Sequence, residues 1–246
     1  MPPDASLPAT QKSRPRAALS RMRRALPLAA LPLLLAGCAS GGASPLGDAL
    51  LAVLPGGEPD TERAEGIPYA SLALDAGDRS GLVVMGARAG DTTLWPTGNR
   101  GLITLYRDGL QATAGLPRDL LETRYRPAAG AAMAEAPGRD AEADYVPWQG
   151  AAPADFSLSR SWQEADGGVT RLSARGRLDC HAPVPRDLPL ASLPLQRCEQ
   201  RLAWEDGSVT TGTLWRDPES YRLWAVKETP WPGGPVIDWE VARPWW

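Results

Sequence analysis

The sequence predicts an all-β domain of mostly antiparallel hairpins, arranged as a sandwich or partly open barrel with one or two short helices. Short stretches with alternating or continuous apolar residues begin at Pro68, which is the pattern of strands. Three Asp-Gly pairs, at 108–109, 166–167 and 206–207, separate such stretches, and Asp-Gly is a strong hairpin signal. No window sustains helical periodicity beyond a couple of turns, so the predicted class is all-β.

In the first half of the domain the pattern predicts five strands and one short helix. Asp108-Gly109 is predicted to be a type I′ turn between the last two strands, because that turn needs positive φ at both central residues. Pro117 suits a first helical turn and predicts a helix over 118–123. The strands are expected at 69–74, 82–85, 92–95, 102–106 and 110–114.

The second half begins after a stretch without periodicity, 127–154, which is predicted to be a long loop or a boundary between subdomains. Residues 182–194 contain four prolines and are also predicted to be loop. The remaining hairpins give strands at 156–162, 169–178, 201–204, 209–215, 223–226 and 236–241.

The N-terminal segment has the pattern of a secretory signal, with three arginines before an apolar run from Ala25 to Leu35. That run is too short to span a bilayer. Leu35-Ala36-Gly37-Cys38 resembles the lipobox of bacterial lipoproteins, which implies cleavage before Cys38 and acylation of that cysteine. The alternatives are an ordinary signal peptide with a chance cysteine, or a buried apolar helix. The true start is Met1 or Met22. We therefore predict a lipoprotein signal at 1–37, a flexible tether at 38–66 and a single β domain at 67–246.

Charge excludes one class of partner. Residues 1–37 hold six of the 26 basic residues and one of the 29 acidic ones, which leaves the chain from Cys38 onward with a formal charge of −8. Nucleic-acid binders need a basic surplus, so no nucleic acid is expected. An acidic glycan would have to meet a local arginine patch, because Lys227 is the sole lysine after Cys38.

Two cysteines remain after Cys38 is assigned to lipid. Cys180 and Cys198 are an even pair in an oxidising compartment, which predicts a disulfide. The alternative is a metal site formed by Cys180, His181 and Cys198. A zinc site has four ligands, and His181 is the one histidine of the chain.

No catalytic motif is recognisable, and we predict a non-catalytic protein that needs no cofactor or metal. A nucleophile elbow, a P-loop and a dinucleotide fingerprint are absent from the sequence. A glycoside hydrolase with paired carboxylates stays open as an alternative. Its acids would come from Asp140, Glu142, Asp144, Asp166 or Glu199.

The ten tryptophans outnumber the single phenylalanine, Phe156. An indole suits both a core and stacking on a sugar ring. The tryptophans inside alternating strands are predicted to be core: Trp162, Trp204, Trp215 and Trp224. Those beside prolines or at the terminus are candidates for glycan or partner contact, with a cap over the end of the domain as the alternative: Trp148, Trp231, Trp245 and Trp246.

Two stretches of the sequence have recognisable motifs. The first is Gly101 to Gly109 followed by the T-x-G-L-x-x-D-L pattern over 113–120. The second is the W-x-D-P pattern over 215–218 with Trp224, Pro230 and the closing Arg243-Pro244. Together they resemble the GfcB/YjbF lipoproteins of capsule and exopolysaccharide loci. One departure is Tyr221-Arg222, where a glycine would suit the turn before Trp224.

The resemblance implies an outer-membrane lipoprotein, attached by its lipid anchor and facing the periplasm, that assists export or assembly of surface polysaccharide. It implies no catalytic residues. The expected partners are the membrane, through the anchor, and a polysaccharide or polysaccharide-export proteins. The absence of aspartate after Cys38 agrees with transport to the outer membrane. A structural envelope lipoprotein without a polymer role is the remaining alternative.

Overall fold

A computed structural model describes residues 60–98, 100–128 and 145–246. These residues form one short α-helix, one 3₁₀ helix and thirteen strands. The helices are α2 (Asp60–Gly66) and η2 (Pro147–Gln149). The strands are β1 (Ser71–Asp75), β2 (Ser80–Val84), β3 (Ala87–Ala89), β4 (Thr92–Pro96), β5 (Leu102–Tyr106), β6 (Gly109–Ala114), β7 (Leu120–Pro127), β8 (Ala154–Gln163), β9 (Val169–Leu188), β10 (Ala191–Trp204), β11 (Val209–Arg216), β12 (Leu223–Glu228) and β13 (Ile237–Arg243).

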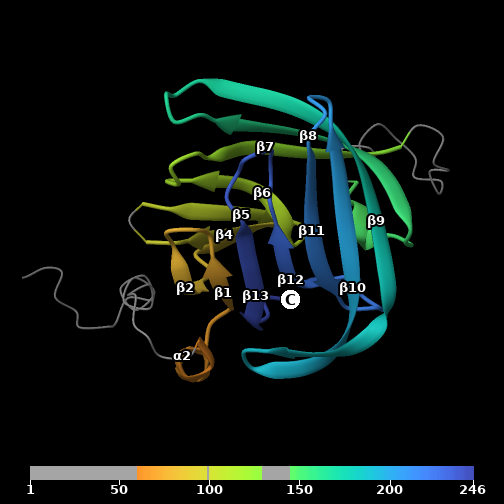
Figure 1. Cartoon of the computed structure of the whole chain (residues 1–246). Coiled ribbons are helices and arrows are strands. Elements are labelled where there is room, and N and C mark those ends of the chain that lie inside the picture. The colour runs from red at the N-terminus through yellow and green to blue at the C-terminus, as the bar shows by residue number, and fades with distance from the viewer. Residues whose placement is uncertain (1–59, 99, 129–144) are drawn as a thin grey trace, which may run out of the picture. The chain divides into compact units, whose positions relative to one another are not determined.

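The strands form two antiparallel sheets (Figure 1). Sheet A has the order β2-β1-β13-β12-β11-β10-β9-β8-β7, and sheet B has the order β3-β4-β5-β6. Strands β1 and β2 lie in sheet A, the chain crosses to sheet B at β3, and it returns to sheet A at β7. The last strand, β13, pairs with the first strand, β1, for example through Leu72↔Val241. The predicted all-β, mostly antiparallel, sandwich-like class is confirmed.

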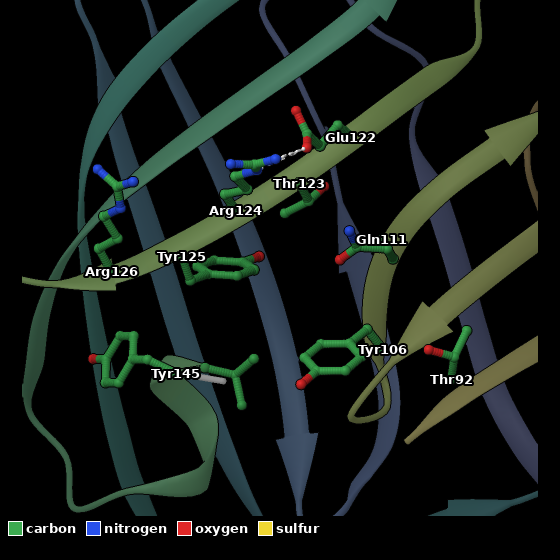
Figure 2. Close-up of a pocket in the computed structure, with 10 residues that line it drawn as sticks. Thr92, Tyr106, Gln111, Glu122, Thr123, Arg124, Tyr125, Arg126 and Tyr145 are labelled. Carbon is green, nitrogen blue, oxygen red and sulfur yellow. Dashed lines mark hydrogen bonds and ion pairs between the residues drawn. The ribbon is translucent and has the colours of Figure 1, made fainter. Parts of the chain in front are cut away.

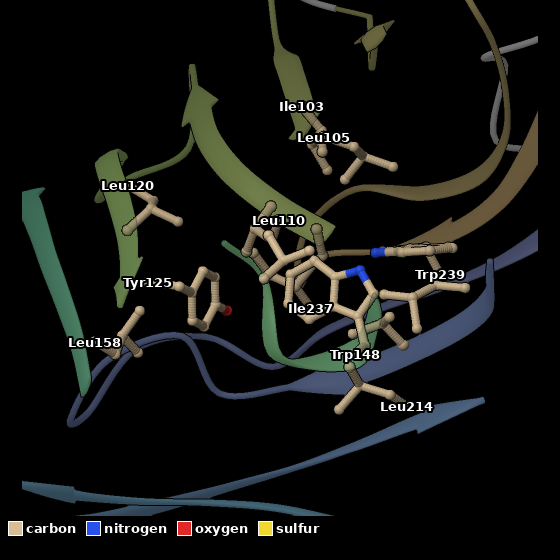
Figure 3. Packing of buried hydrophobic residues seen from close by; sticks show 14 of the residues in the cluster. Ile103, Leu105, Leu110, Leu120, Tyr125, Trp148, Leu158, Leu214, Ile237 and Trp239 are labelled. Atoms are coloured by element: carbon tan, nitrogen blue, oxygen red, sulfur yellow. The ribbon is translucent and has the colours of Figure 1, made fainter. Parts of the chain in front are cut away.

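The core lies between the two sheets (Figure 3). Sheet B contributes residues such as Ile103 and Leu105, which face Leu158 and Leu214 of sheet A. The indole of Trp148, on the 3₁₀ helix, fills the space between them and is 2% exposed. A tryptophan on a short 3₁₀ helix therefore completes the core that the strands begin.

The β5–β6 turn is shifted by one residue from its predicted position. Positive φ occurs at Arg107 (47°) and Asp108 (72°), and Tyr106 pairs with Gly109. Gly109 is instead needed for close approach, because a Cβ atom there would lie 2.2 Å from the Trp148 ring. The two later Asp-Gly turns lie where predicted and have positive φ at their glycines: Gly167 and Gly207.

The predicted helix over 118–123 is wrong, because this segment enters strand β7. Asp119 accepts hydrogen bonds from the backbone N–H groups of Gly115 (2.8 Å) and Leu116 (3.0 Å). Thr113 donates to Asp119 at 3.0 Å and accepts from the Leu120 N–H at 2.9 Å. The T-x-G-L-x-x-D-L pattern thus folds the crossover from sheet B to sheet A.

The W-x-D-P pattern also folds a turn. The Asp217 carboxylate accepts hydrogen bonds from the backbone N–H groups of Glu219 (3.0 Å) and Ser220 (2.7 Å). Tyr221, where a glycine was expected, has φ of +58°. The guanidinium of Arg216 lies 4.5 Å from its ring, and this stacking holds a strained residue in place.

The predicted loop over 182–194 is wrong as well, because the prolines lie in the extended hairpin of β9 and β10. Strand β8 begins opposite Leu178 and strand β11 ends opposite Gln196, so beyond these points each hairpin strand has one unpaired edge. Proline is tolerated at such edges because its missing N–H is not needed for pairing. Leu190 at the tip packs against Ala64, Leu82 and Ala242.

The structure describes residues 60–66 of the segment that was predicted to be a tether. Helix α2 lies within 38–66, and Arg243 donates to the backbone oxygens of Ile67 (2.9 Å) and Ala64 (3.4 Å). Within 127–154 the described part contains the helix η2, and the remainder lies outside the described residues. Across residues 60–98, 100–128 and 145–246, no helix has the length and apolar character to cross a membrane.

Candidate functional site

A cleft of about 580 Å³ opens where the edge of sheet B faces the edge of sheet A (Figure 2). Strand β7 is the last strand of sheet A and β6 the last of sheet B, so their outer edges have no neighbouring strand among the described residues. We name this hollow the tyrosine cleft. Its lining residues are Thr92, Tyr106, Gln111, Glu122, Thr123, Arg124, Tyr125, Arg126, Tyr145 and Val146.

The wall formed by β7 is fixed from behind by a buried arginine. Arg160 of β8 is completely buried and donates to Glu228 Oε2 at 2.8 Å and to the Pro230 carbonyl at 2.7 Å. It also donates to Thr123 Oγ1 (3.2 Å) and to the Tyr125 hydroxyl (3.3 Å). Two lining side chains are therefore held by one charged network.

The charge of this network is maintained inside the core. Burial lowers the pKa of Arg160, but its interactions with Glu228 and Tyr125 together outweigh burial and hold that pKa above its usual range. Burial raises the pKa of Tyr125, so its phenol stays neutral. The buried pair is satisfied by several hydrogen bonds, which a desolvated ion pair needs.

The three tyrosines offer rings and hydroxyls of different accessibility. Tyr125 is nearly buried and packs edge-on against Trp148, with ring centroids 5.2 Å apart. Tyr106 and Tyr145 are half-buried and face the cleft from its other side (Figure 2). Burial, together with the Asp155 carboxylate, raises the pKa of Tyr145. Flat rings with a polar edge suit stacking on a ligand that also forms hydrogen bonds.

The described part of the lining contains one carboxylate, Glu122, which pairs with Arg124 at 2.7 Å and Arg171 at 3.3 Å. Of the acids suggested for a hydrolase, Asp166 caps the Gly168 N–H at 2.9 Å and Glu199 pairs with Arg197 at 2.7 Å. The other three, Asp140, Glu142 and Asp144, lie outside the described residues. The tyrosine cleft therefore offers stacking and hydrogen bonding, and its described lining brings no two carboxylates together.

The predicted cysteine pair is confirmed as the disulfide Cys180–Cys198, which joins facing residues of β9 and β10. Because both sulfurs are bonded to each other, the metal site with His181 is not formed. His181 lies instead 3.8 Å from Glu199. Cys38 lies outside the described residues, so lipid attachment stays a prediction.

Two of the four tryptophans predicted for glycan or partner contact are in the core. Trp148 is 2% exposed and Trp231 is completely buried, stacked on Trp162 with centroids 5.6 Å apart. The segments that contain the neighbouring prolines lie over the core, so these two indoles point inward. Trp245 is half-buried against Trp95, and Trp246 is 40% exposed.

The core prediction holds for two of the four strand tryptophans. Trp162 and Trp204 are buried, whereas Trp215 and Trp224 are half-buried. Trp215 lies on the opposite face of its strand from Leu214, where the guanidinium of Arg186 stacks 4.5 Å from its ring.

Sequence reasoning missed the residues of the tyrosine cleft because they come from four strands and a loop that meet only in the fold. One signal was present in β7. Residues 122–126 alternate charged side chains with Thr123 and Tyr125, which is the period of a half-buried strand.

One solved structure places this arrangement among known folds. The chain matches the crystal structure of the hypothetical lipoprotein YmcC from Escherichia coli K12 with a TM-score of 0.60, over 81% of this chain and 92% of that one. The two proteins share a fold. Their sequences are 12% identical, so the likeness concerns the fold alone. No protein-family model matches the chain, and no curated protein matches it by sequence.

Proposed function

We propose that this protein is an outer-membrane lipoprotein that binds polysaccharide as a non-catalytic accessory in the export or assembly of a surface polymer. The observation that carries the proposal is the tyrosine cleft. Its lining combines tyrosine rings, hydroxyls, the Gln111 amide and two arginines in an open hollow of about 580 Å³. Aromatic faces and hydrogen-bonding groups together are what a sugar chain requires of a site.

Anchoring at the membrane is supported by the sequence around Cys38. A basic flank, a short apolar run and Leu35-Ala36-Gly37-Cys38 together make a lipoprotein signal. The fold shared with a protein described as a hypothetical lipoprotein agrees with this placement. Two or more acyl chains on Cys38 would make the attachment stable, and the domain would face the periplasm.

The resemblance to the GfcB/YjbF lipoproteins supports the polysaccharide role. The residues that carry it form the β6–β7 crossover and the β11–β12 turn. A likeness in such turn residues is a likeness in architecture. The ligand class must therefore be tested on the cleft itself.

The test is a deletion strain complemented with the wild type, Cys38→Ser or the double variant Tyr106→Ala/Tyr145→Ala. Tyr69→Ala is the matched control, because Tyr69 is 48% exposed and does not line the cleft. Polymer is quantified at the cell surface and in the periplasm, with protein levels checked by immunoblot.

We expect deletion to empty the surface, the wild type and Tyr69→Ala to restore polymer, and both Cys38→Ser and the double variant to fail. Unchanged surface polymer in the deletion strain would overturn the export role. Full restoration by the double variant would remove the tyrosine cleft from that role.

A further inference from the structure

Among the residues that the structure describes, arginines are concentrated on the outer face of sheet A. Where β7 to β10 lie side by side, seven arginines face outward against four carboxylates, although the chain from Cys38 has a formal charge of −8. We name these seven residues the arginine strip: Arg124, Arg126, Arg171, Arg175, Arg177, Arg197 and Arg201. The carboxylates are Glu122, Asp155, Asp179 and Glu199.

Several arginines of the strip form ion pairs with carboxylates of the same face. Arg177 pairs with Asp155 at 3.1 Å and Asp179 at 3.0 Å, and the hydrogen bonds that it donates to Asp179 and Asp155 raise its pKa. Arg197 pairs with Glu199 at 2.7 Å. Glu122 is shared between Arg124 and Arg171.

Two arginines of the strip have no such partner. The exposed side chains of Arg175 and Arg201 form no hydrogen bond or ion pair with any described residue. They are diagonal neighbours, because Arg175 pairs with Ala203 and Arg201 pairs with Arg177. Such a diagonal separates the two residues by about 7–8 Å. The guanidinium groups of Arg175 and Arg201 therefore lie close together at the surface and can both donate hydrogen bonds to a ligand.

A groove of about 310 Å³ runs beside them. Its floor consists of serines of β8 and β9, Ser157, Ser159 and Ser173, and arginines rise on both sides. The register places Arg126 opposite Ser157 and Ser157 opposite Arg175, so a line of hydroxyls separates two rows of guanidinium groups. At a strand spacing of about 4.8 Å these rows are about 10 Å apart.

We propose that the arginine strip binds an anionic polysaccharide that carries carboxylates along its chain, with sugar hydroxyls on the serine floor. This inference rests on the proposed function and names the class of polymer. A guanidinium binds carboxylates in bidentate fashion, which a chain of evenly spaced carboxylates would exploit. Arg124 and Arg126 line both the groove and the tyrosine cleft, so one chain can contact both.

The composition of the strip itself does not favour single-stranded nucleic acid or a membrane surface. None of its outward-facing residues on β7 to β10 is phenylalanine, tyrosine or tryptophan within residues 120–127, 154–163, 169–181 and 197–204. Nucleic-acid single strands bind on stacked aromatic rings, and membrane-surface proteins use tryptophan and tyrosine as interfacial anchors. Serine hydroxyls between arginines suit a hydroxylated anionic chain.

The test uses the full-length chain purified in a non-ionic detergent and immobilised polygalacturonate as the probe. Fully methyl-esterified polygalacturonate is the matched neutral polymer. The variant is Arg175→Gln/Arg201→Gln, and the control is Arg100→Gln, an exposed arginine between β4 and β5 of sheet B. Affinity is measured between 20 and about 200 mM salt, because contacts with a polyanion weaken as salt rises.

We expect the wild type and Arg100→Gln to bind polygalacturonate and not to bind its methyl ester. Arg175→Gln/Arg201→Gln should bind about tenfold more weakly and with a shallower salt dependence, since each exposed ion pair contributes up to about fivefold. Circular dichroism of the double variant should match that of the wild type.

Equal losses in the variant and the control, or equal binding of the methyl ester, would overturn the proposal. Binding of phosphatidylglycerol mixed micelles through Arg175 and Arg201 without binding of polygalacturonate would assign the strip to lipid and overturn it as well. A failure here leaves the deletion phenotype untouched, whereas an unchanged deletion phenotype with intact polygalacturonate binding would refute only the export role.

Discussion

The two faces of strand β8 place the same backbone in opposite environments. The inner residues are buried in the core, and Arg160 is the one charged side chain among them. The outer residues carry hydroxyls and a carboxylate and face the arginine strip. The inner set is Phe156, Leu158, Arg160 and Trp162, and the outer set is Asp155, Ser157 and Ser159.

This difference shows that an arginine of this fold has a structural role when protein groups surround it and is available to a ligand when they do not. Arg160 has a carboxylate, a carbonyl and two hydroxyls around it, so its charge serves the structure. Arg175 is at the surface and has no protein partner among the described residues. A buried charge must be satisfied internally, whereas an exposed one can be offered to a ligand.

The largest effect should follow from removing the inner charge. Arg160→Met leaves Glu228 buried without its cation, and we expect a loss of about 3–5 kcal/mol in the free energy of unfolding. Urea denaturation followed by tryptophan fluorescence measures this loss.

The double variant Arg160→Met/Glu228→Met sharpens the result, because it removes both charges. It should recover most of the lost stability, since replacing both members of a buried pair by apolar groups is often neutral. If the double variant is as unstable as the sum of the single changes, the pair is not the reason for the loss.

The next largest effect concerns packing on the inner face. Gly176 of β9 lies opposite Phe156, and a Cβ atom there would lie 2.2 Å from the phenyl ring. Gly176→Ala should cost about 1–3 kcal/mol, because the ring must move within a packed core. A thermal melt within one degree of the wild type would show that the inner face tolerates overpacking.

A smaller effect should depend on pH. Asp108 pairs with Arg222 at 3.0 Å, but burial outweighs this contact and raises the pKa of Asp108 above its ordinary 3.8. The folded state therefore keeps the proton to a higher pH than the unfolded state. Stability falls as the pH rises from about 3.8 through the raised pKa.

Asp108→Asn should lack this loss, so its stability relative to the wild type should increase across that pH window. Urea denaturation at several pH values between 3.5 and 6.5 measures the difference. A difference that stays constant or reverses with pH would show that the ion pair with Arg222 outweighs burial.

The smallest effect on stability belongs to the outer face. Ser157→Ala and Arg175→Gln touch exposed groups, and each should change the free energy of unfolding by less than about 0.5 kcal/mol. A loss above about 1 kcal/mol for either one would mean that the outer face is structural and would erase the contrast with Arg160.

The sequence predicted the features that depend on local pattern. The strands with clear alternation, the Asp-Gly turns at 166–167 and 206–207 and the Cys180–Cys198 disulfide are all in the structure. The helix predicted at 118–123 failed because Asp119 binds the backbone of the preceding turn rather than starting a helix.

The failures at 182–194 and at the tryptophans have a non-local origin. Prolines in β9 and β10 are tolerated only because the neighbouring strands end before them. The burial of Trp148 depends on Gly109, which lies far away in the chain and leaves room for the ring. The tyrosine cleft needs the edges of two sheets to meet, and no single stretch of sequence encodes that meeting.

One measurement tests the central claim, that the outer face of sheet A serves the ligand and the inner face serves the fold. The deletion strain is complemented at equal protein levels with Arg175→Gln/Arg201→Gln or Arg100→Gln, and surface polymer is quantified. The account predicts that Arg100→Gln restores the polymer and that the double variant, folded and membrane-bound, does not. Equal restoration by both would contradict it.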